Sequence, residues 1–209
     1  MTKLTQYIQY KNDIFNKLNF DFEPGKTMLD LGCGDGSDSV IFRDHFKLEV
    51  TSVDIYEHEN IKVEKLNYVK AGIYEIPFPD NTFDYIFLHD VLHHIDEENQ
   101  AYDRHIAGMI EAKRVLKPGG SIVIVEGNRY NPLFYPHMVK MMGHNHWKQA
   151  YFKKVVVDSC GQDCEIKFQY FEAHAYPWAV WFWKMYEWVM DNLSPNSFKA
   201  YNIAIITKK

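Results

Sequence analysis

Two patterns of apolar residues alternate along the first two thirds of the chain. Short runs rich in β-branched residues predict five strands, at 27–31, 50–53, 68–70, 83–88 and 121–125. Apolar positions at helical spacing predict helices between them, over 37–46, 57–66 and 101–116. Small polar residues from Ser37 onward are expected to cap the first of these helices, and the turn 117–120 (KPGG) to end the last. This alternation predicts a parallel sheet with helices on both faces.

The two ends of the chain depart from this alternation. Helical spacing predicts an amphipathic helix over 4–18, after which Glu23-Pro24-Gly25 breaks the chain. After residue 126 the pattern predicts helices over 149–158 and 178–190 and strands over 165–171 and 202–207. We expect a single domain, composed of a helical cap (1–26), a central half (27–126) and a C-terminal half (127–209).

Composition narrows the class of protein without giving a function. The 209 residues, 46% hydrophobic and 24% charged, fit one globular domain. A formal net charge of −5 argues against broad binding of a nucleic-acid backbone, because no positive field attracts its phosphates. Cys33, Cys160 and Cys164 are too few for a disulfide scaffold, and the polar first residues do not resemble a secretion signal. We therefore expect a cytoplasmic protein.

A glycine-rich loop, Gly32-Cys33-Gly34-Asp35-Gly36, stands between the first strand and the next helix. Glycines let the backbone approach a ligand closely, and a helix start offers free N–H groups, so the loop predicts a site for adenosine or phosphate. A dinucleotide fingerprint needs its third glycine one position later, where Ser37 stands. Asp30 and Asp35 would also repel a pyrophosphate and favour a cationic ligand. The alternative is a turn that serves only strand–helix packing.

Five blocks of sequence, in order, resemble the class I S-adenosylmethionine-dependent methyltransferase family. They are 29–36 (LDLGCGDG), 53–55 (VDI), 76–84 (IPFPDNTFD), 90–95 (DVLHHI) and 114–120 (RVLKPGG). Their order and spacing over about residues 28–126 carry the resemblance. It implies a Rossmann-like, doubly wound, mostly parallel seven-stranded sheet, in which the last strand inserts antiparallel near one edge. It also implies S-adenosylmethionine as the cofactor, bound by the half 27–126.

The resemblance assigns cofactor contacts to the ends of the first two strands. The backbone of Gly32 and Gly34, with Cys33 between them, would lie against the methionine part of the cofactor, and Asp30 near its ammonium group through water. Asp54 ends the second strand, where one carboxylate can accept protons from both ribose hydroxyls.

The adenine end of the cofactor and its sulfonium involve three further positions. Ile55 would pack on one face of the adenine. Gly72 stands where the family often has an aspartate that accepts a hydrogen bond from the adenine amino group. Without that carboxylate, only the neighbouring Ile73 is expected to contact the adenine, as a weaker contact. His89 ends the fourth strand and would help to close the pocket around the sulfonium, with a packing or capping role as the alternative.

The implied reaction is an SN2 transfer of the methyl group to an oxygen, nitrogen, sulfur or carbon atom. The protein aligns the two reactants, so a dedicated base is optional. Candidate catalytic residues are His89, Glu126 and His137. Glu126, Asn128 and His93 are candidate contacts to the methyl acceptor, with a structural role as the alternative for His93. Glu126 and Asn128 follow the fifth strand and are expected to face the acceptor side of the cleft.

Two groups of residues raise the question of a metal. His137, His144 and His146 could bind a divalent ion or supply a base, but Gly143 interrupts the segment and a solvated loop is the favoured alternative. Cys160 and Cys164 could supply two ligands, with no third ligand at a recognisable spacing. The sequence therefore predicts no metal.

Four of the five tryptophans lie in the segment 176–190, where Lys184, Glu187 and Asp191 share a narrow polar face of a helix. The segment is too short and too interrupted to span a bilayer. Three interpretations stay open: core packing against the sheet, an apolar lid or homodimer surface, and contact with a membrane surface for a lipid-like substrate.

These observations predict an S-adenosylmethionine-dependent methyltransferase that acts on a small, partly apolar molecule. A protein that binds the cofactor without turnover, as a regulator or partner, is one alternative. A nicotinamide-dependent oxidoreductase is another, and Ser37 and the block 76–78 disfavour it.

Overall fold

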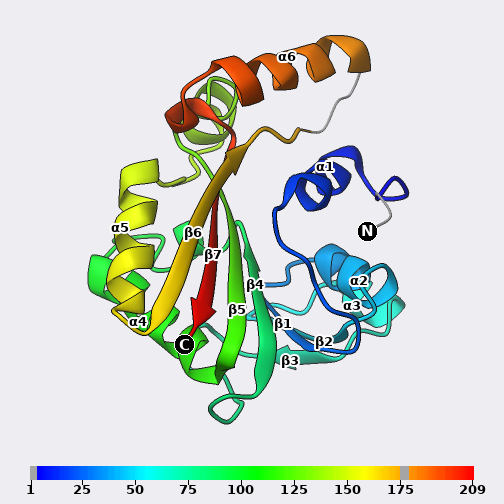
Figure 1. Cartoon of the computed structure of the whole chain (residues 1–209), viewed down its shortest axis with the longest axis vertical. Coiled ribbons are helices and arrows are strands. Elements are labelled where there is room, and N and C mark those ends of the chain that lie inside the picture. Colours follow the sequence, from blue (N-terminus) through cyan, green and yellow to red (C-terminus); the bar gives the residue numbers. More distant parts are fainter. Residues whose placement is uncertain (1–3, 175–178) are drawn as a thin grey trace.

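The computed structural model describes residues 4–174 and 179–209 and has one mixed sheet at its centre (Figure 1). The strands are β1 (Thr27–Leu31), β2 (Glu49–Asp54), β3 (Tyr68–Lys70), β4 (Phe83–His89), β5 (Leu116–Gly127), β6 (Cys164–Phe171) and β7 (Tyr201–Lys208). The α-helices are α1 (Gln9–Lys17), α2 (Ser37–Asp44), α3 (Glu59–Val63), α4 (Tyr102–Val115), α5 (Gln149–Cys160) and α6 (Val180–Leu193). The other helical segments are the 3-10 turns η1 (Leu92–His94) and η3 (Asn196–Phe198) and the π-helix η2 (Tyr135–Met141).

The seven strands are arranged in the order β3-β2-β1-β4-β5-β7-β6. The strands β1 to β5 pair in parallel, and β7 pairs antiparallel with both β5 and β6. This arrangement confirms the Rossmann-like, doubly wound sheet and its antiparallel last strand. The strand order reverses between β1 and β4, which is the point where open sheets of this kind bind ligands, beyond the carboxyl ends of the strands.

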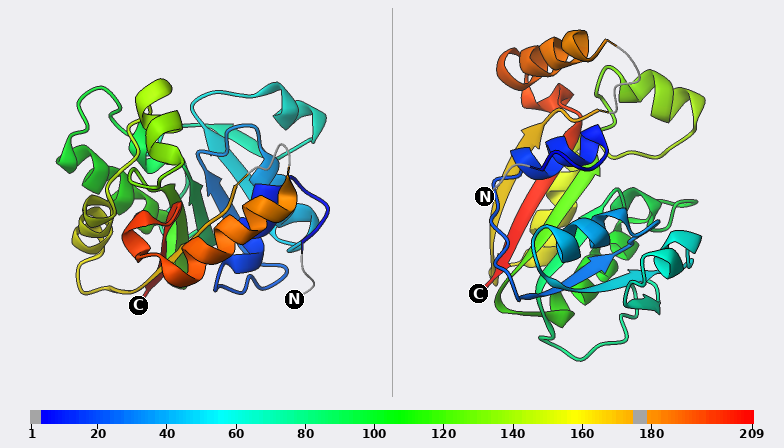
Figure 2. Two further views of the ribbon diagram at one scale, coloured as in Figure 1. Left: turned by 90° about the horizontal axis from the view of Figure 1, so that it is seen from above. Right: turned by 90° about the vertical axis from the view of Figure 1, so that its right-hand side faces the viewer.

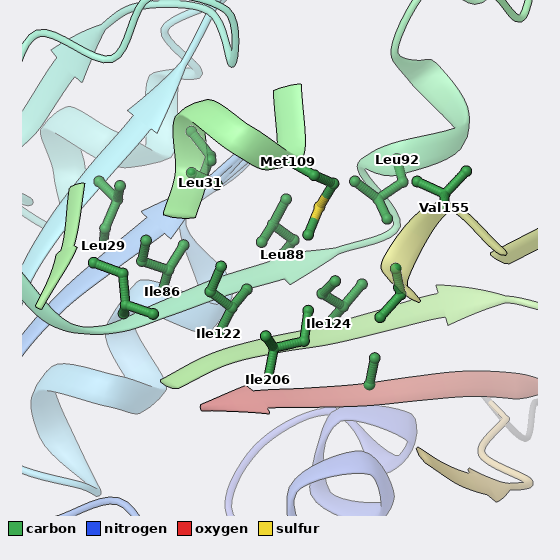
Figure 3. Packing of buried hydrophobic residues seen from close by; sticks show 14 of the residues in the cluster. Leu29, Leu31, Ile86, Leu88, Leu92, Met109, Ile122, Ile124, Val155 and Ile206 are labelled. Carbon is green, nitrogen blue, oxygen red and sulfur yellow. The ribbon is translucent and has the colours of Figure 1, made fainter. Parts of the chain in front are cut away.

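Successive residues of β4 face opposite sides of the sheet and supply two separate cores. Ile86 and Leu88 lie on one face, where Met109 of α4 and Val155 of α5 pack in the same buried cluster (Figure 3). Phe87 lies on the other face, between Phe15 of α1 and Phe42 of α2. Side chains alternate across a strand, so a continuous apolar run such as 85–88 is expected where both faces are covered.

The predicted elements form with small shifts at their ends. The strands at 27–31 and 68–70 have the expected bounds, whereas the first helix begins at Gln9 rather than Leu4. The predicted start of the late helix, Trp178, lies outside the described residues. No small polar side chain caps α2: Gly36 holds the cap position, and Asp35 Oδ1 accepts from the backbone N–H of Ser37 at 3.0 Å.

The segment 117–120 lies between α4 and the regular part of β5, where the turn is predicted, and it bulges out of the sheet. Helix α4 ends at Val115 and β5 begins at once, with Leu116 opposite Phe83. The next paired residue of β5 is Ser121, opposite Tyr85, so the four residues between them bulge out of the ladder. Gly119, at φ +77°, permits the bulge because it lacks a Cβ.

Helix α6 lies across α1 at one end of the molecule (Figure 2), and ion pairs join its polar face to α1. Lys17 Nζ lies 2.7 Å from Asp191 Oδ2, and Lys184 Nζ lies 2.8 Å from Asp13 Oδ2. The opposite, apolar face is exposed, including Trp181 at 74% and Trp188 at 60%. The predicted packing of these tryptophans against the sheet is therefore wrong. Ion pairs with α1 hold the polar face of α6 toward the protein, which leaves the tryptophans on the exposed face. No helix in the described ranges is long and apolar enough to cross a membrane.

Candidate active site

The three glycines of the loop between β1 and α2 differ in what surrounds them. All three have positive φ, at +79°, +52° and +77° for Gly32, Gly34 and Gly36. A Cβ on Gly32 would lie 2.4 Å from Val91 Cγ2, and one on Gly36 would lie 2.5 Å from Leu66 Cδ1. A Cβ on Gly34 would meet nothing within 4 Å. Gly32 and Gly36 thus serve packing, and Gly34 faces open space that a ligand can occupy.

Asp54, the last residue of β2, lies against this loop. Its Oδ2 accepts a hydrogen bond from the backbone N–H of Gly34 at 2.9 Å, and its Oδ1 accepts from that of Tyr56 at 3.1 Å. The neighbouring Ile55 is 52% exposed, which leaves its side chain available to a ligand. Ile73 is half-buried and packs instead against Gly108 of α4, where a Cβ would lie 3.3 Å from its atoms.

The side chains of Asp30 in β1 and Cys33 in the loop are both buried. Asp30 is 2% exposed, and its Oδ2 accepts from the hydroxyl of Ser39 at 2.6 Å. Burial raises the pKa of Asp30, and the nearby charge of Asp38 raises it further. Burial likewise raises the pKa of the Cys33 thiol, so this cysteine is not a nucleophile at neutral pH. Both side chains are buried, so neither presents an exposed group for direct contact with a ligand.

His89, at the end of β4, belongs to a buried charge network. Its Nδ1 lies 2.8 Å from Asp38 Oδ2, and Lys11 Nζ of α1 lies 2.6 Å from the same oxygen. Burial opposes charge on Asp38, but Lys11 and His89 outweigh it and hold the pKa of Asp38 well below its usual range. The pKa of Lys11 is raised correspondingly. The network joins α1, α2 and β4 around the point where the strand order reverses.

Glu126, near the end of β5, is fully buried and holds the turn η1. Its Oε1 pairs with His93 Nδ1, and its Oε2 accepts from the backbone N–H of Leu92 at 3.0 Å. Burial lowers the pKa of His93, but the Glu126 carboxylate outweighs burial and raises it. Direct contact between Glu126 and an acceptor was wrongly expected, because the carboxylate has no exposed surface. It instead fixes the position of His93.

The Asn128 side chain is not open to an acceptor either. Its amide donates to the carbonyl oxygens of Ser197 at 2.8 Å and Lys199 at 2.9 Å, and its Oδ1 accepts from the N–H of Tyr130 at 3.3 Å. The side chain is fully buried, and its polar atoms form hydrogen bonds that hold the connection between β5 and β7. Its position after a buried strand predicts that the side chain faces the cleft, whereas the side chain points toward the segment before β7.

The three histidines expected to cluster do not all come together. His137 is exposed on η2, while His144 and His146 lie near His93, with ring centroids 6.2 Å and 4.4 Å from it. His146 is buried, so a solvated loop is the wrong description of this residue. Burial lowers the pKa of His146, and the neighbouring His93 adds to the effect.

Lys11, Asp38 and Asp90 are residues of the site that the sequence did not predict. Lys11 shares a face of α1 with the apolar residues Ile14 and Phe15, three and four positions later, and a lysine on such a face signals a buried charge partner. Asp90 directly follows β4 with φ +54°, and its Oδ1 accepts from the N–H of Gly127 at 2.8 Å. An acidic residue at the end of a strand beside the reversal point was the available signal.

Residues 29–124 match the family model described as a methyltransferase domain. The match spans the loop, Asp54, His89 and the turn η1, which are the parts that surround the reversal point. This match agrees with the resemblance of the chain to the class I S-adenosylmethionine-dependent methyltransferases. S-adenosylmethionine is accordingly the cofactor that the matched segment is expected to bind.

Curated relatives match about half of the chain. Phosphoethanolamine N-methyltransferase 2 of Caenorhabditis elegans is 34% identical over 113 residues, which are 50% of this chain and 24% of the relative. The ubiquinone/menaquinone biosynthesis C-methyltransferase of Shewanella piezotolerans is 36% identical over 116 residues, 49% of this chain and 43% of the relative. The methyltransferase domain thus spans less than half the length of these relatives.

Solved structures match nearly the whole chain. A SAM-dependent methyltransferase from Archaeoglobus fulgidus has a TM-score of 0.63 at 21% identity, covering 90% of this chain and 88% of its own. A putative methyltransferase of Haloferax volcanii, in complex with the Trm112 activator, has a TM-score of 0.69 at 15% identity, covering 96% and 89%. At these identities the likeness is one of fold.

The residues of the methyltransferase domain fit the cofactor. The open side of Gly34, the Asp54 carboxylate and the exposed Ile55 line one side of the reversal point, as a ribose and an adenine require. On the other side, Asp38 is already paired with Lys11, which leaves buried Asp30 as the acidic residue whose ionised form a positively charged ligand would favour.

Proposed function

We propose that this chain transfers a methyl group from S-adenosylmethionine to a small-molecule acceptor. The observation that carries the proposal is the pairing of Asp54 with the N–H of Gly34, a glycine with open space on its Cβ side, at the reversal point of the sheet. The relatives named for phosphoethanolamine and quinone methylation support a small acceptor.

The cofactor supplies an activated methyl group and its own leaving group. The chain's residues bind and orient it. The backbone at Gly32 and Gly34 lies along the methionine part, and Asp54 accepts from the ribose hydroxyls. Ile55 covers one face of the adenine, with Ile73 beyond it. His89, held by Asp38, limits the space at the sulfonium end. Because alignment provides much of the rate, this geometry suffices without a dedicated base.

The acceptor is proposed to enter from the side of β5 and η2. A cavity of about 550 Å³ there is lined by aromatic and basic side chains, among them Arg129, Tyr130, Tyr135 and Lys148, and by His146. Tyrosine rings provide apolar surface, and Arg129 and Lys148 favour an acceptor with an anionic group. Of the candidate catalytic residues, Glu126 acts through His93, and His137, exposed and apart from both, is left outside the site.

The exposed apolar face of α6 is a candidate surface for contact with other molecules. Val180, Trp181, Met185 and Trp188 are exposed, which leaves an acceptor lid, a homodimer surface and contact with a membrane surface as proposals. A cytoplasmic location is likewise a proposal, supported by the three free cysteines.

Methyl transfer is tested by incubating the protein with methyl-labelled S-adenosylmethionine and small molecules that carry amine, phenol, thiol or activated-carbon nucleophiles. We expect label in one class of product, and loss of that label in the Asp54→Ala variant at low cofactor concentration. Tight cofactor binding with no labelled product from any class would favour a binding protein without turnover.

A further inference from the structure

Histidines from two distant segments converge beside the methyltransferase site. His93 comes from η1, and His144 and His146 come from the segment between η2 and α5. One ring nitrogen from each can be chosen so that all three atoms lie within 4.8 Å of one another. Ligands of a tetrahedral zinc ion lie roughly 3.3 Å apart, at metal–nitrogen distances of about 2.0–2.1 Å. Small side-chain movements therefore bring the three nitrogens onto one ion.

Three ring nitrogens of this cluster lack hydrogen-bond partners among the described residues. His146 is 4% exposed, and neither of its ring nitrogens has a hydrogen-bond partner among the described residues. Nε2 of His93, which is 1% exposed, also has none in that part of the chain. Buried polar atoms without partners cost free energy, so three such atoms in adjacent imidazoles call for a ligand.

The surroundings of His93 match those of a metal ligand. Its Nδ1 pairs with the Glu126 carboxylate, which fixes the ring and leaves Nε2 directed elsewhere. A carboxylate behind a histidine is the usual support of metal-bound imidazoles, because it sets the tautomer and raises the basicity of the ligand nitrogen. Asp90 adds a further nearby oxygen, since it forms a second potential group with His93, Glu126 and His146.

We infer that His93, His144 and His146 bind a divalent transition-metal ion of the zinc class. Imidazole nitrogens suit zinc, copper, iron and nickel, whereas magnesium and calcium prefer oxygen ligands. Three histidines leave at least one coordination position free, as in zinc sites that receive a further ligand. His144 is only half-buried, and His146 lines the 550 Å³ cavity, so this position is reachable from outside. The inference goes beyond the proposed methyl transfer and does not depend on it.

The test is metal binding by the whole chain without an affinity tag. Protein stripped with a chelator is titrated with Co²⁺, whose visible absorption reports tetrahedral coordination, and Zn²⁺ is then added in competition. We expect one Co²⁺ per chain and displacement by one Zn²⁺. The same titration with His144→Gln and His146→Gln should lose this stoichiometric binding, and Glu126→Gln should weaken it by about 10–100-fold.

His137→Gln is the matched control, because this exposed histidine lies in the preceding turn and outside the cluster. It should bind Co²⁺ as the unchanged protein does. Since His146 is buried and its variant could fail to fold, the half-buried His144 provides the decisive variant, with thermal unfolding as a check. Absence of stoichiometric binding in the unchanged protein, or unaltered binding in folded His144→Gln, would overturn the inference.

Discussion

Asp54 Oδ2 accepts a hydrogen bond from the backbone N–H of Gly34 at 2.9 Å, although the two residues belong to different strand ends. The contact holds the glycine loop against the end of β2 and places a carboxylate beside the open side of Gly34. The hydrogen-bond acceptor for a ribose is thus in position before the cofactor binds. Preorganisation of this kind lowers the cost of ordering the site on binding.

Replacement of Asp54 by alanine should weaken S-adenosylmethionine binding by about 1.5–3 kcal/mol, through loss of hydrogen bonds to a charged acceptor. Calorimetric titration measures the change. Glu57→Gln, three residues farther along, is the control and should leave the affinity unchanged. Equal affinity in Asp54→Ala would mean that the ribose lies elsewhere.

Gly32→Ala should destabilise the protein more than Gly25→Ala. Both glycines have φ +79°, so both variants suffer the left-handed backbone, at roughly 1–2 kcal/mol. Only Gly32 has Val91 Cγ2 at 2.4 Å from the new Cβ, which adds about 1–3 kcal/mol of overpacking. Urea unfolding of both variants measures the difference, and Val91→Ala in the Gly32→Ala background should recover part of the loss. Equal losses at the two glycines would contradict the close packing.

Glu187 should make stability depend on pH. Burial raises the pKa of Glu187 to about 7, since Lys17 offsets the loss of water only in part. Between about pH 4.5 and 7 the unfolded chain releases this proton and the folded chain keeps it, so the free energy of unfolding falls as pH rises.

Glu187→Gln should remove this dependence and raise the free energy of unfolding at pH 8 by roughly 1–3 kcal/mol, with little change at pH 4. Urea unfolding at the two pH values provides the measurement. Loss of stability in Glu187→Gln at pH 8 would show instead that ion pairs to Lys17 and Lys184 dominate.

The exposed face of α6 should tolerate polar substitution. Trp181→Ser and Trp188→Ser are each expected to change the free energy of unfolding by less than about 0.5 kcal/mol, as surface substitutions do. Met190→Ala, on the buried side of the same helix, should cost about 2–5 kcal/mol. Denaturant unfolding compares the three. A large loss at either tryptophan would restore the core-packing interpretation.

The sheet and the cofactor loop could be predicted because their signals are local. Apolar runs at 27–31 and 83–88 match strands covered on both faces, and glycines mark a turn whose φ values only glycine adopts readily. Asp54 could be placed because parallel strands end at the same edge of a sheet.

The remaining parts depend on contacts between distant segments. The helical pattern of 180–193 predicts a polar and an apolar face, but it does not predict which of the two packs against the rest of the protein. The polar face does so, because it forms ion pairs with charged residues of α1. Lys11 meets Asp38 across 27 residues, and His93 meets His146 only through the path of the loop before α5. Glu126 and Asn128 were misplaced because a position after a strand does not fix the direction of a side chain.

Cofactor preference tests the central claim most directly. Calorimetric titration of the unchanged protein with S-adenosylmethionine, S-adenosylhomocysteine and NADH compares the two cofactor classes at one site. We predict micromolar or tighter binding of both sulfur ligands, one per chain, and no binding of NADH. Binding of NADH but of neither sulfur ligand would contradict the assignment of the loop, Asp54 and the site they form.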